Sequence, residues 1–276
     1  MTRAAVVGCG IMGSGITFVA RAAGFPVTAV EPTDELLAAA RERVERHEAQ
    51  ARKRNAELGE LAPLEMTTDV AAAVSAADVV IEAVPEDLDV KRDVFGALGA
   101  AAGDDTVIAS NTSGLSIEAL GSASGRSSQV VGLHFFNPVP AMRLVEVVRA
   151  PDTTDATVAR GVEFARAVGK ETVEVRDMPG FVTTRLGTLL MCEAMRAYEQ
   201  GVASAEHVDT AMKLGYNHPM GPLELADRVG LDTVLFILDD LHEAYGDAFK
   251  APPLLREMVA DGKLGRKTGA GFYEYG

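Results

Sequence analysis

The stretch Ala4-Ala5-Val6-Val7-Gly8-Cys9-Gly10-Ile11-Met12-Gly13 joins an apolar run to a glycine-rich turn near the start of the chain. The apolar run predicts a buried strand, and the residues after the turn have the periodicity of a helix. Gly8 permits a tight turn, Gly10 lets the backbone approach a pyrophosphate, and Gly13 lets the helix pack closely on the strand. The stretch therefore indicates a dinucleotide site, with the phosphates at the amino end of the helix.

An acidic residue, Glu31, ends the next predicted strand, about 20 residues after the glycine turn. A carboxylate there accepts a hydrogen bond from a ribose 2′-hydroxyl and repels a 2′-phosphate. A plain strand–helix turn is the alternative interpretation, but strand, turn, helix, strand and acid follow in the order that a dinucleotide site requires. The sequence thus favours NAD over NADP as the cofactor.

Length and composition limit the possible classes of protein. The 276 residues exceed a typical single domain, so one large or two smaller domains are expected. No apolar run approaches the roughly 18 residues that span a membrane, and the first predicted strand starts too early for a signal peptide. Cys9 and Cys192 are interpreted as free thiols in a reducing cytoplasm. The net charge of −14 argues against nucleic acid and anionic membranes as partners.

Up to about residue 176, short apolar runs alternate with helical stretches, a pattern typical of βαβ units and a parallel sheet. Strands are predicted over Arg3–Gly8, Pro26–Glu31, Leu64–Thr67, Asp78–Ala83, Thr106–Ala109, Gln129–Leu133, Leu144–Val148 and Thr172–Val175. Helices are predicted over Met12–Ala23, Asp34–Leu58, Asp69–Ser75, Asp87–Ala101 and Thr154–Val168, with Asp34 and Asp69 as N-caps.

Beyond Asp177-Met178-Pro179-Gly180 only helical periodicity remains, over Leu186–Gln200, Ser204–Leu214, Leu223–Tyr245 and Pro253–Ala260. The predicted fold class is α/β: a Rossmann-type, mostly parallel sheet with a long helical insertion, followed by an all-α C-terminal domain. The domains are placed at 1–178 and 179–276. Apolar residues crowd more than one face of the Leu223–Tyr245 helix, which favours a homodimer through the C-terminal helices.

The long predicted helix after Glu31 is rich in basic residues: Arg41, Arg43, Arg46, Arg52, Lys53 and Arg54. One interpretation is a solvated face, because Glu42, Glu45 and Glu48 interleave at helical spacing. The other is a patch for an anionic ligand, since residues 52–54 are expected to lack a nearby acidic partner on their N-terminal side. The sequence leaves both open.

Two segments offer groups for chemistry beside a cofactor. The loop Ser110-Asn111-Thr112-Ser113-Gly114 follows a predicted strand, where open α/β sheets bind ligands, although such a loop is as often a plain turn. His134 ends another predicted strand and precedes two aromatic residues that could shield a nicotinamide. Glu146 lies in an apolar strand, where a carboxylate requires a partner.

The pairing of His134 with Glu146 depends on how the chain turns between them. If the two strands run out and back through Asn137-Pro138-Val139-Pro140, the imidazole and the carboxylate meet. The carboxylate then fixes the tautomer of a base that can take a proton from an alcohol while hydride passes to the cofactor. The His, Cys and Asp residues have no spacing typical of a zinc site.

The order of these motifs resembles that of 3-hydroxyacyl-CoA dehydrogenases, over essentially the whole chain. Besides the glycine turn and the Ser110–Gly114 loop, the shared motifs are Glu82-Ala83-Val84-Pro85-Glu86, Gly132-Leu133-His134-Phe135-Phe136-Asn137-Pro138, Leu144-Val145-Glu146, Pro179-Gly180-Phe181-Val182, Pro219-Met220-Gly221-Pro222-Leu223-Glu224-Leu225 and Gly265–Tyr273. The resemblance implies NAD-dependent oxidation of an (S)-3-hydroxyacyl-CoA to the 3-ketoacyl-CoA, or the reverse, as in fatty acid metabolism.

The resemblance also implies roles for individual residues. His134 would be the general base, oriented by Glu146, with Ser113 on the 3-oxygen of the substrate and Asn137 fixing the substrate or the nicotinamide. Arg54 would face the phosphates of coenzyme A. Cofactor contacts would come from Gly8, Gly10, Ile11, Met12, Gly13, Glu31, Asn111 and Lys267, with Glu86 and Lys91 beside the nicotinamide ribose.

Two residues depart from the family pattern. Thr184 stands where the family usually has an asparagine on the substrate side, and Gly114 stands where a second serine is common. Both bear on acyl-chain preference, and neither alters the His–Glu pair. The alternatives are a dehydrogenase of the same fold acting on an acyl-carrier-protein thioester or a sugar acid, and a non-catalytic NADH-binding relative of the kind found among lens crystallins.

Overall fold

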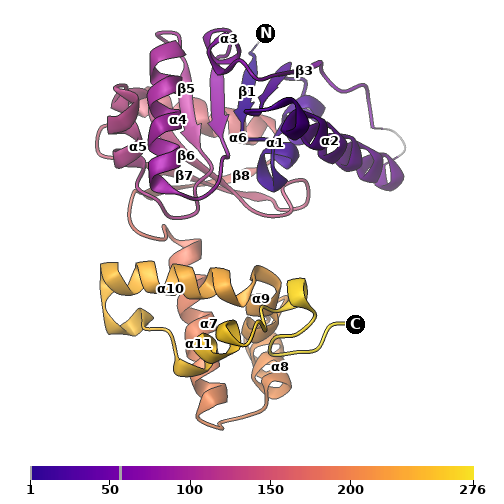
Figure 1. Cartoon of the computed structure of the whole chain (residues 1–276), viewed down its shortest axis with the longest axis vertical. Helices are drawn as coiled ribbons and strands as arrows, with labels where there is room; N and C mark the ends of the chain where they lie inside the picture. The colour runs from indigo at the N-terminus through magenta and orange to yellow at the C-terminus, as the bar shows by residue number, and fades with distance from the viewer. Residues whose placement is uncertain (1, 56–57) are drawn as a thin grey trace. The chain divides into compact units, whose positions relative to one another are not determined.

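An eight-stranded sheet organises the first of two compact units, residues 1–178, and the second unit comprises residues 179–276. The computed structural model describes residues 2–55 and 58–276. The strand order is β3-β2-β1-β4-β5-β6-β7-β8, and neighbours are parallel except for the antiparallel pair β6 and β7 (Figure 1). The strands are β1 (Ala4–Val7), β2 (Val27–Val30), β3 (Leu64–Thr67), β4 (Val79–Glu82), β5 (Val107–Ser110), β6 (Val130–Phe135), β7 (Leu144–Arg149) and β8 (Glu171–Arg176). The predicted mostly parallel Rossmann-type sheet is confirmed.

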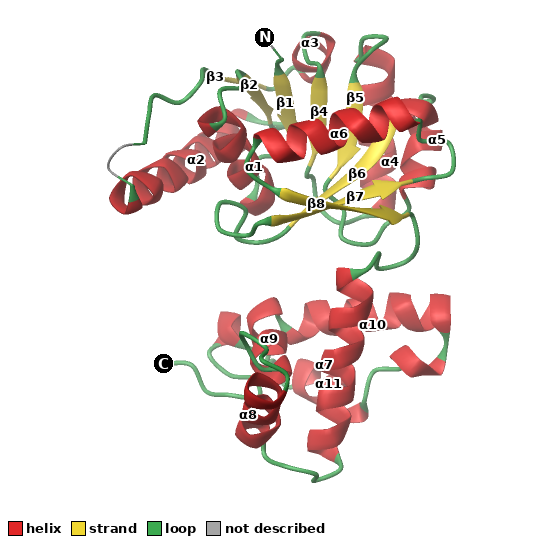
Figure 2. Cartoon of the chain, turned by 180° about the vertical axis from the view of Figure 1, so that it is seen from behind, coloured by secondary structure: helices red, strands yellow, loops and turns green. Residues whose placement is uncertain are grey.

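Helices cover both faces of this sheet. In Figure 2, α6 lies in front of the strands, whereas α4 and α5 lie behind them. One core joins α1 and α6 to the strands, for example through Ile16, Val6 and Phe164. The helices of the first unit are α1 (Ile11–Ala22), α2 (Asp34–Arg54), α3 (Val70–Ser75), α4 (Leu88–Ala101), α5 (Ile117–Ser124) and α6 (Asp155–Ala167).

Helix α5 was not predicted from the sequence. It is short and carries small polar residues, so its apolar periodicity is weak, but Ile117 and Leu120 are buried. The Ser116 hydroxyl accepts a hydrogen bond from Ala119 N–H and caps the amino end, and Gly125 closes the other end in the left-handed region.

Helix α2 differs from its predicted bounds at both ends. Its N-cap is Thr33, whose hydroxyl accepts from Leu36 N–H, and not the predicted Asp34, which is the first helical residue. The backbone becomes extended at Asn55, so the predicted end at Leu58 is also wrong. Part of that prediction fell on residues 56–57, which lie outside the described residues.

Five α-helices make up the second unit, as the structure describes it: α7 (Thr183–Glu199), α8 (Ala205–Gly215), α9 (Pro222–Val229), α10 (Leu231–Tyr245) and α11 (Pro253–Ala260). The predicted continuous helix Leu223–Tyr245 is broken at Gly230, which has a φ of +104°. Only glycine adopts that backbone without strain, so the chain changes direction there although apolar residues continue on both sides. The core of the unit is apolar and includes Met195, Leu223 and Leu238.

Two buried carboxylates accept hydrogen bonds from residues 272–275 and so hold this segment against helices α8 and α9. Asp209 of α8 accepts from the N–H groups of Leu223 and Glu224 and from the Tyr273 hydroxyl. Asp227 of α9 accepts from the N–H groups of Phe272 and Tyr273 and from the Tyr275 hydroxyl. The segment 272–275 is therefore held by hydrogen bonds to charged acceptors, which are stronger than neutral ones.

Candidate active site

The glycine turn has the geometry that a pyrophosphate needs. Gly8 has a φ of +85° and packs so closely on the β4–α4 loop that a Cβ there would lie 2.7 Å from Val84 N. A Cβ on Gly13 would overlap the carbonyl oxygen of Gly8, which explains the close approach of α1 to β1. At Gly10, by contrast, an added Cβ meets no described protein atom within 4 Å. The turn therefore leaves space at the amino end of α1.

The amino end of α1 suits an anion. In the described structure no side chain caps this helix and its first turn contains no acidic residue, so its partial positive charge is not compensated locally. Ile11 is 70% exposed beside the turn, although it is apolar. Uncapped N–H groups and an exposed apolar side chain together fit the phosphates and one apolar face of a dinucleotide.

Glu31 lies directly after β2, next to the turn. Its Oε1 accepts a hydrogen bond of 2.6 Å from the Cys9 N–H, and the side chain is largely buried. The carboxylate is thereby held at the edge of the glycine turn, where it can also accept from a ribose hydroxyl.

The structure brings His134 and Glu146 together. They are opposite neighbours in the antiparallel pair β6 and β7, and His134 Nδ1 lies 2.8 Å from Glu146 Oε2. Glu146 is completely buried. Because an ionised carboxylate only accepts hydrogen bonds, Nδ1 carries the proton and Nε2 keeps its lone pair. The pair therefore has the form of a general base with an orienting carboxylate.

The two aromatic residues after His134 do different things. Phe136 packs on the His134 ring, with the ring centroids 4.4 Å apart. Phe135 points the other way and is buried in the core of the sheet, so the expectation that both could shield a nicotinamide is wrong for this residue. Strand β6 continues to Phe135, two residues beyond its predicted end, and side chains alternate across a strand.

Asn137 lies exposed in the loop between β6 and β7, and its peptide bond to Pro138 is cis. The loop is held by buried Lys170, directly before β8, whose Nζ donates to the carbonyl oxygens of Val139 at 2.6 Å and Met142 at 2.8 Å. Asn137, which the family resemblance places in the site, therefore lies on a loop that is held in place by hydrogen bonds.

The loop after β5 is held by Glu86. Its Oε1 accepts from the Thr112 hydroxyl at 2.7 Å, from Ser113 N–H at 2.8 Å and from the Ser113 hydroxyl at 2.9 Å. Asn111 accepts from Phe135 N–H through its amide oxygen and so links the ends of β5 and β6. The loop that carries Ser113 thus lies beside the strand that carries His134.

The side chain of Lys91 is buried, with 1% of it exposed. Its Nζ lies 2.6 Å from Glu82 Oε1, 3.4 Å from Glu86 Oε2 and 3.2 Å from the Val84 carbonyl oxygen. Burial alone raises the pKa of Glu86, but the Lys91 charge and the hydrogen bonds from Thr112 and Ser113 outweigh it and hold this pKa below its ordinary value.

Sequence reasoning named Ser110 only as part of its loop and Glu82 only within a shared motif, and it did not predict that the two belong to the same cluster. The Ser110 hydroxyl donates to Glu82 Oε2 at 2.6 Å, and both residues are completely buried. The signal was present in the sequence, because Glu82 ends the apolar run Val79-Val80-Ile81 as Glu146 interrupts its own strand. A carboxylate in such a strand requires partners.

The other predicted residues lie on several elements of the two units. Arg54 is exposed at the end of α2, and Met12 is partly buried beside Ile11. Thr184 lies in the first turn of α7, and Lys267 forms an ion pair with Asp232; both belong to the second unit. The expectation that residues 52–54 lack an acidic partner is wrong for Arg52, which pairs with Glu48 at 3.0 Å one helical turn back.

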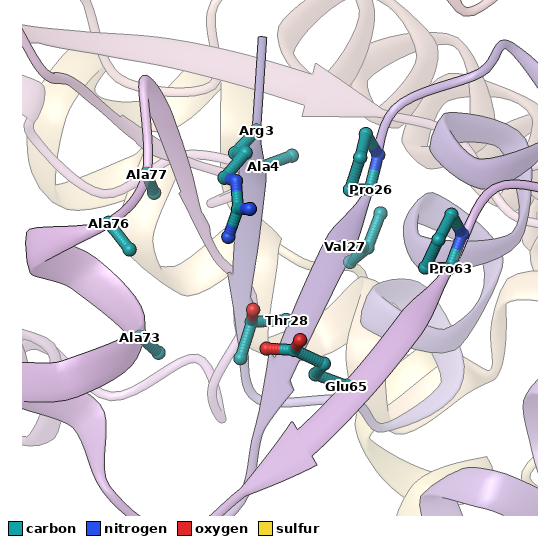
Figure 3. A pocket seen from close by; sticks show the side chains of 10 residues that line it. All are labelled: Arg3, Ala4, Pro26, Val27, Thr28, Pro63, Glu65, Ala73, Ala76 and Ala77. Atoms are coloured by element: carbon teal, nitrogen blue, oxygen red, sulfur yellow. The ribbon is translucent and has the colours of Figure 1, made fainter. Parts of the chain in front are cut away.

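A separate cavity of about 170 Å³ lies at the amino ends of β1, β2 and β3. Figure 3 shows the polar side chains of Arg3, Thr28 and Glu65 lining it, together with Ala73 of α3 and with Ala76 and Ala77, which follow that helix. It therefore lies at the end of the sheet opposite to the glycine turn, where open α/β sheets do not usually bind their cofactors.

Within residues 2–55 and 58–276, no group of three His, Cys, Asp or Glu side chains could hold a metal ion. The helices described in the same ranges are all too short or too polar to cross a membrane.

Comparisons with known proteins agree with this geometry. Residues 3–178 match the family model of the 3-hydroxyacyl-CoA dehydrogenase NAD-binding domain, and residues 180–275 match that of the C-terminal domain. The human mitochondrial hydroxyacyl-coenzyme A dehydrogenase is 43% identical over 98% of this chain and 90% of its own length. A probable 3-hydroxybutyryl-CoA dehydrogenase of Deinococcus radiodurans is also 43% identical, over 98% of this chain and 99% of its own length.

Solved structures show the same relationship. The (S)-3-hydroxybutyryl-CoA dehydrogenase of Ralstonia eutropha has a TM-score of 0.95 and 37% identity, covering 100% of this chain and 99% of its own. The cofactor of the first unit is NAD, as its family model and its glycine turn both indicate. The chain is an NAD-dependent dehydrogenase and belongs to the 3-hydroxyacyl-CoA dehydrogenase family.

Proposed function

We propose that the protein oxidises (S)-3-hydroxyacyl-CoA to 3-ketoacyl-CoA, and catalyses the reverse reaction, with His134 as general base. The observation that carries the proposal is the contact between His134 Nδ1 and Glu146 Oε2, 2.8 Å apart near the carboxyl end of β6. This is the edge of the sheet at which the glycine turn also lies, after β1. Relatives named for this activity support the substrate class.

The mechanism follows from the direction of the hydrogen bond. Because Nδ1–H donates to Glu146, the lone pair on Nε2 can take the proton of the substrate 3-hydroxyl. Bound NAD supplies the position that accepts the hydride. The buried carboxylate then stabilises the imidazolium, and in the reverse direction His134 returns the proton to the 3-oxygen.

Ser113 and Asn137 are proposed as the groups that hold the substrate beside the base. Ser113 would bind the 3-oxygen, and Asn137, on its fixed loop, would bind the substrate or the nicotinamide. Thr184 is proposed to contact the substrate through its hydroxyl, and exposed Arg54 is proposed to bind the phosphates of coenzyme A.

Cofactor contacts are proposed at the glycine-turn edge of the first unit and at one residue of the second unit. The glycine turn with Ile11 and Met12 would hold the pyrophosphate, and Glu31 would bind the adenosine ribose. Glu86, supported by Lys91, would lie at the nicotinamide ribose, and Asn111 and Lys267 would complete the set.

A homodimer through the C-terminal helices is proposed from exposed apolar side chains of the second unit. Leu186, Leu214 and Phe236 are all more than half exposed, which is costly for side chains of this size in a monomer. Light scattering on a size-exclusion column tests this, and the mass of a monomer at micromolar concentration would contradict it.

A cytoplasmic location is proposed because Cys9 and Cys192 are both free and buried, as expected in a reducing compartment. Fractionation of the source cells with immunodetection tests this, and recovery in a membrane-enclosed or secreted fraction would contradict it.

NADH oxidation with acetoacetyl-CoA, run beside free acetoacetate, tests the proposed reaction. We expect turnover of the thioester, little turnover of the free acid, and loss of activity in H134A. Equal turnover of both substrates would contradict the CoA assignment. Bound NADH without turnover of the thioester would favour another carrier or a non-catalytic relative.

A further inference from the structure

Strand β4 ends in a carboxylate that the proposed mechanism does not use. Glu82 is 0% exposed and lies beside Ser110 of β5 in the register of the parallel pair. Burying an ion pair costs desolvation free energy that an apolar pair of similar volume avoids, so fold stability is a weak reason for Glu82 and Lys91 to be charged. Their place at the ligand-binding edge of the sheet suggests a role in the site.

Glu82 holds both segments that border the site. Its Oε1 accepts from Val84 N–H at 2.7 Å, in the segment against which Gly8 packs. Its backbone oxygen accepts from Asn111 N–H at 2.8 Å, and its Oε2 accepts from the Ser110 hydroxyl at 2.6 Å. The residue thus connects the glycine turn with the loop that carries Ser113.

Lys91 extends this connection. Its ammonium lies 2.6 Å from Glu82 and 3.4 Å from Glu86, so one buried cation is shared by two carboxylates. Glu86 in turn accepts from Ser113 through both the N–H and the hydroxyl. If Glu82 lost its charge, Lys91 would have Glu86 as its only close carboxylate within the cluster and would draw it away from Ser113.

We propose that Glu82 is a positioning residue that acts through Lys91 on Glu86, and thereby sets the orientation of Ser113. The inference rests on the proposed roles of Glu86 at the cofactor and Ser113 at the substrate. Glu82 itself touches neither ligand, so its effect must pass entirely through its neighbours.

The variant E82Q keeps the shape of the side chain and removes its charge. We expect kcat with acetoacetyl-CoA to fall about tenfold or more, because small misplacements of a substrate-binding group cost this much. The dissociation constant of NADH, measured by its fluorescence, should rise as Glu86 moves. E65Q, an exposed glutamate on β3, is the matched control and should change neither quantity.

A double-variant cycle separates positioning from general damage. In the E86Q background the residue through which Glu82 acts has already lost its charge, so adding E82Q should change kcat by less than about twofold. A full tenfold loss in that background would overturn the proposal, as would an unchanged kcat and NADH affinity in folded E82Q.

S110A provides a second, milder test if E82Q does not fold. It removes the hydroxyl that donates to Glu82 Oε2 and accepts from Thr112 N–H, and it leaves every charge in place. We expect a smaller loss of kcat that again disappears in the E86Q background, and persistence of the loss there would contradict the proposal. NADH binding is measured without turnover, so it tests this inference even if wild-type protein does not reduce acetoacetyl-CoA.

Discussion

His134 and Glu146 face each other across β6 and β7, and their side chains meet at 2.8 Å because the two strands are antiparallel in this register. Every other neighbouring pair of strands in the described sheet is parallel. The reversal places a residue from near the end of one strand opposite one from the middle of the next. The proposed base and its proposed orienting carboxylate are thereby each held by a strand of the sheet.

The first prediction concerns the base. H134A should lower kcat by about 10²- to 10⁴-fold, the range for loss of a general base, while the NADH dissociation constant stays near that of the wild type. Steady-state kinetics with acetoacetyl-CoA and NADH fluorescence check this. H207A, at an exposed position on α8, is the control. If H134A retained a tenth or more of the wild-type kcat, the proton must be taken by another group.

The second prediction concerns the orienting carboxylate. In E146Q the amide can donate to Nδ1, which stabilises the tautomer that has its proton on the wrong nitrogen. We expect kcat to fall by about 10²- to 10⁴-fold. E174Q changes an exposed glutamate on β8 and should leave kcat unchanged. A kcat equal to wild type in E146Q would show that the tautomer of His134 is set by some other group.

The third prediction concerns the choice of cofactor. E31Q should lower the ratio of kcat/KM for NAD to that for NADP by about tenfold or more, because a like charge opposite the 2′-phosphate is removed. Some loss with NAD itself is expected, since Glu31 also accepts from Cys9 N–H. E35Q is the control on a nearby exposed glutamate. An unchanged ratio would mean that NADP is rejected elsewhere in the site.

The fourth prediction is a dependence of stability on pH. The pKa of Glu86 in the folded protein lies below its ordinary value of 4.5. A lowered pKa means that the ionised form is favoured by folding, so its stabilisation is complete above about pH 5 and is lost as the pH falls through the folded pKa. Urea unfolding of wild type and E86Q should therefore differ at pH 6 to 7 and converge toward pH 3. A difference that grew on acidification would contradict this sign.

The fifth prediction concerns thiol reactivity. Burial raises the pKa of Cys9 to about 11, so at pH 8 little thiolate is present for alkylation. Iodoacetamide followed by mass spectrometry should find Cys9 unmodified in native protein and modified in urea. Cys192 is also buried, and burial raises its pKa, so it should behave in the same way. Rapid labelling of native Cys9 would mean that the glycine turn opens in solution.

Much of the fold could be predicted because buried parallel strands are continuous apolar runs. The edge strand Leu64–Thr67 and the helix Pro253–Ala260, neither of them a fully buried apolar run, also have the bounds that their own patterns predicted. Where the pattern was ambiguous the prediction failed: Gly230 interrupts a helix whose apolar residues continue beyond it, and α5 has too few apolar residues for a clear period. Apolar periodicity alone does not show where the backbone changes direction at Gly230, or whether a short segment such as α5 becomes a helix.

Part of the candidate site could likewise be predicted from the sequence, and part could not. The meeting of His134 and Glu146 could be foreseen because a single loop connects two strands that follow each other in the chain. For Glu82 the sequence indicates that the carboxylate needs partners but does not identify them, because this requires β4 and β5 to be neighbours and Lys91 to turn inward from α4, which only the packed structure decides. The two phenylalanines after His134 are a further example. That Phe135 is buried in the core could be inferred from the alternation of side chains only once β6 was known to include this residue.

The fastening of residues 272–275 to Asp209 and Asp227 has a consequence for synthesis on the ribosome. Both aspartates are made well before Phe272, Tyr273 and Tyr275, the residues that donate hydrogen bonds to them. Until those residues have left the exit tunnel, two carboxylates in the helical unit lack these donors, and burying them in that state is costly. The second unit therefore completes this packing only after Tyr275 has emerged, whereas none of these bonds involves the first unit.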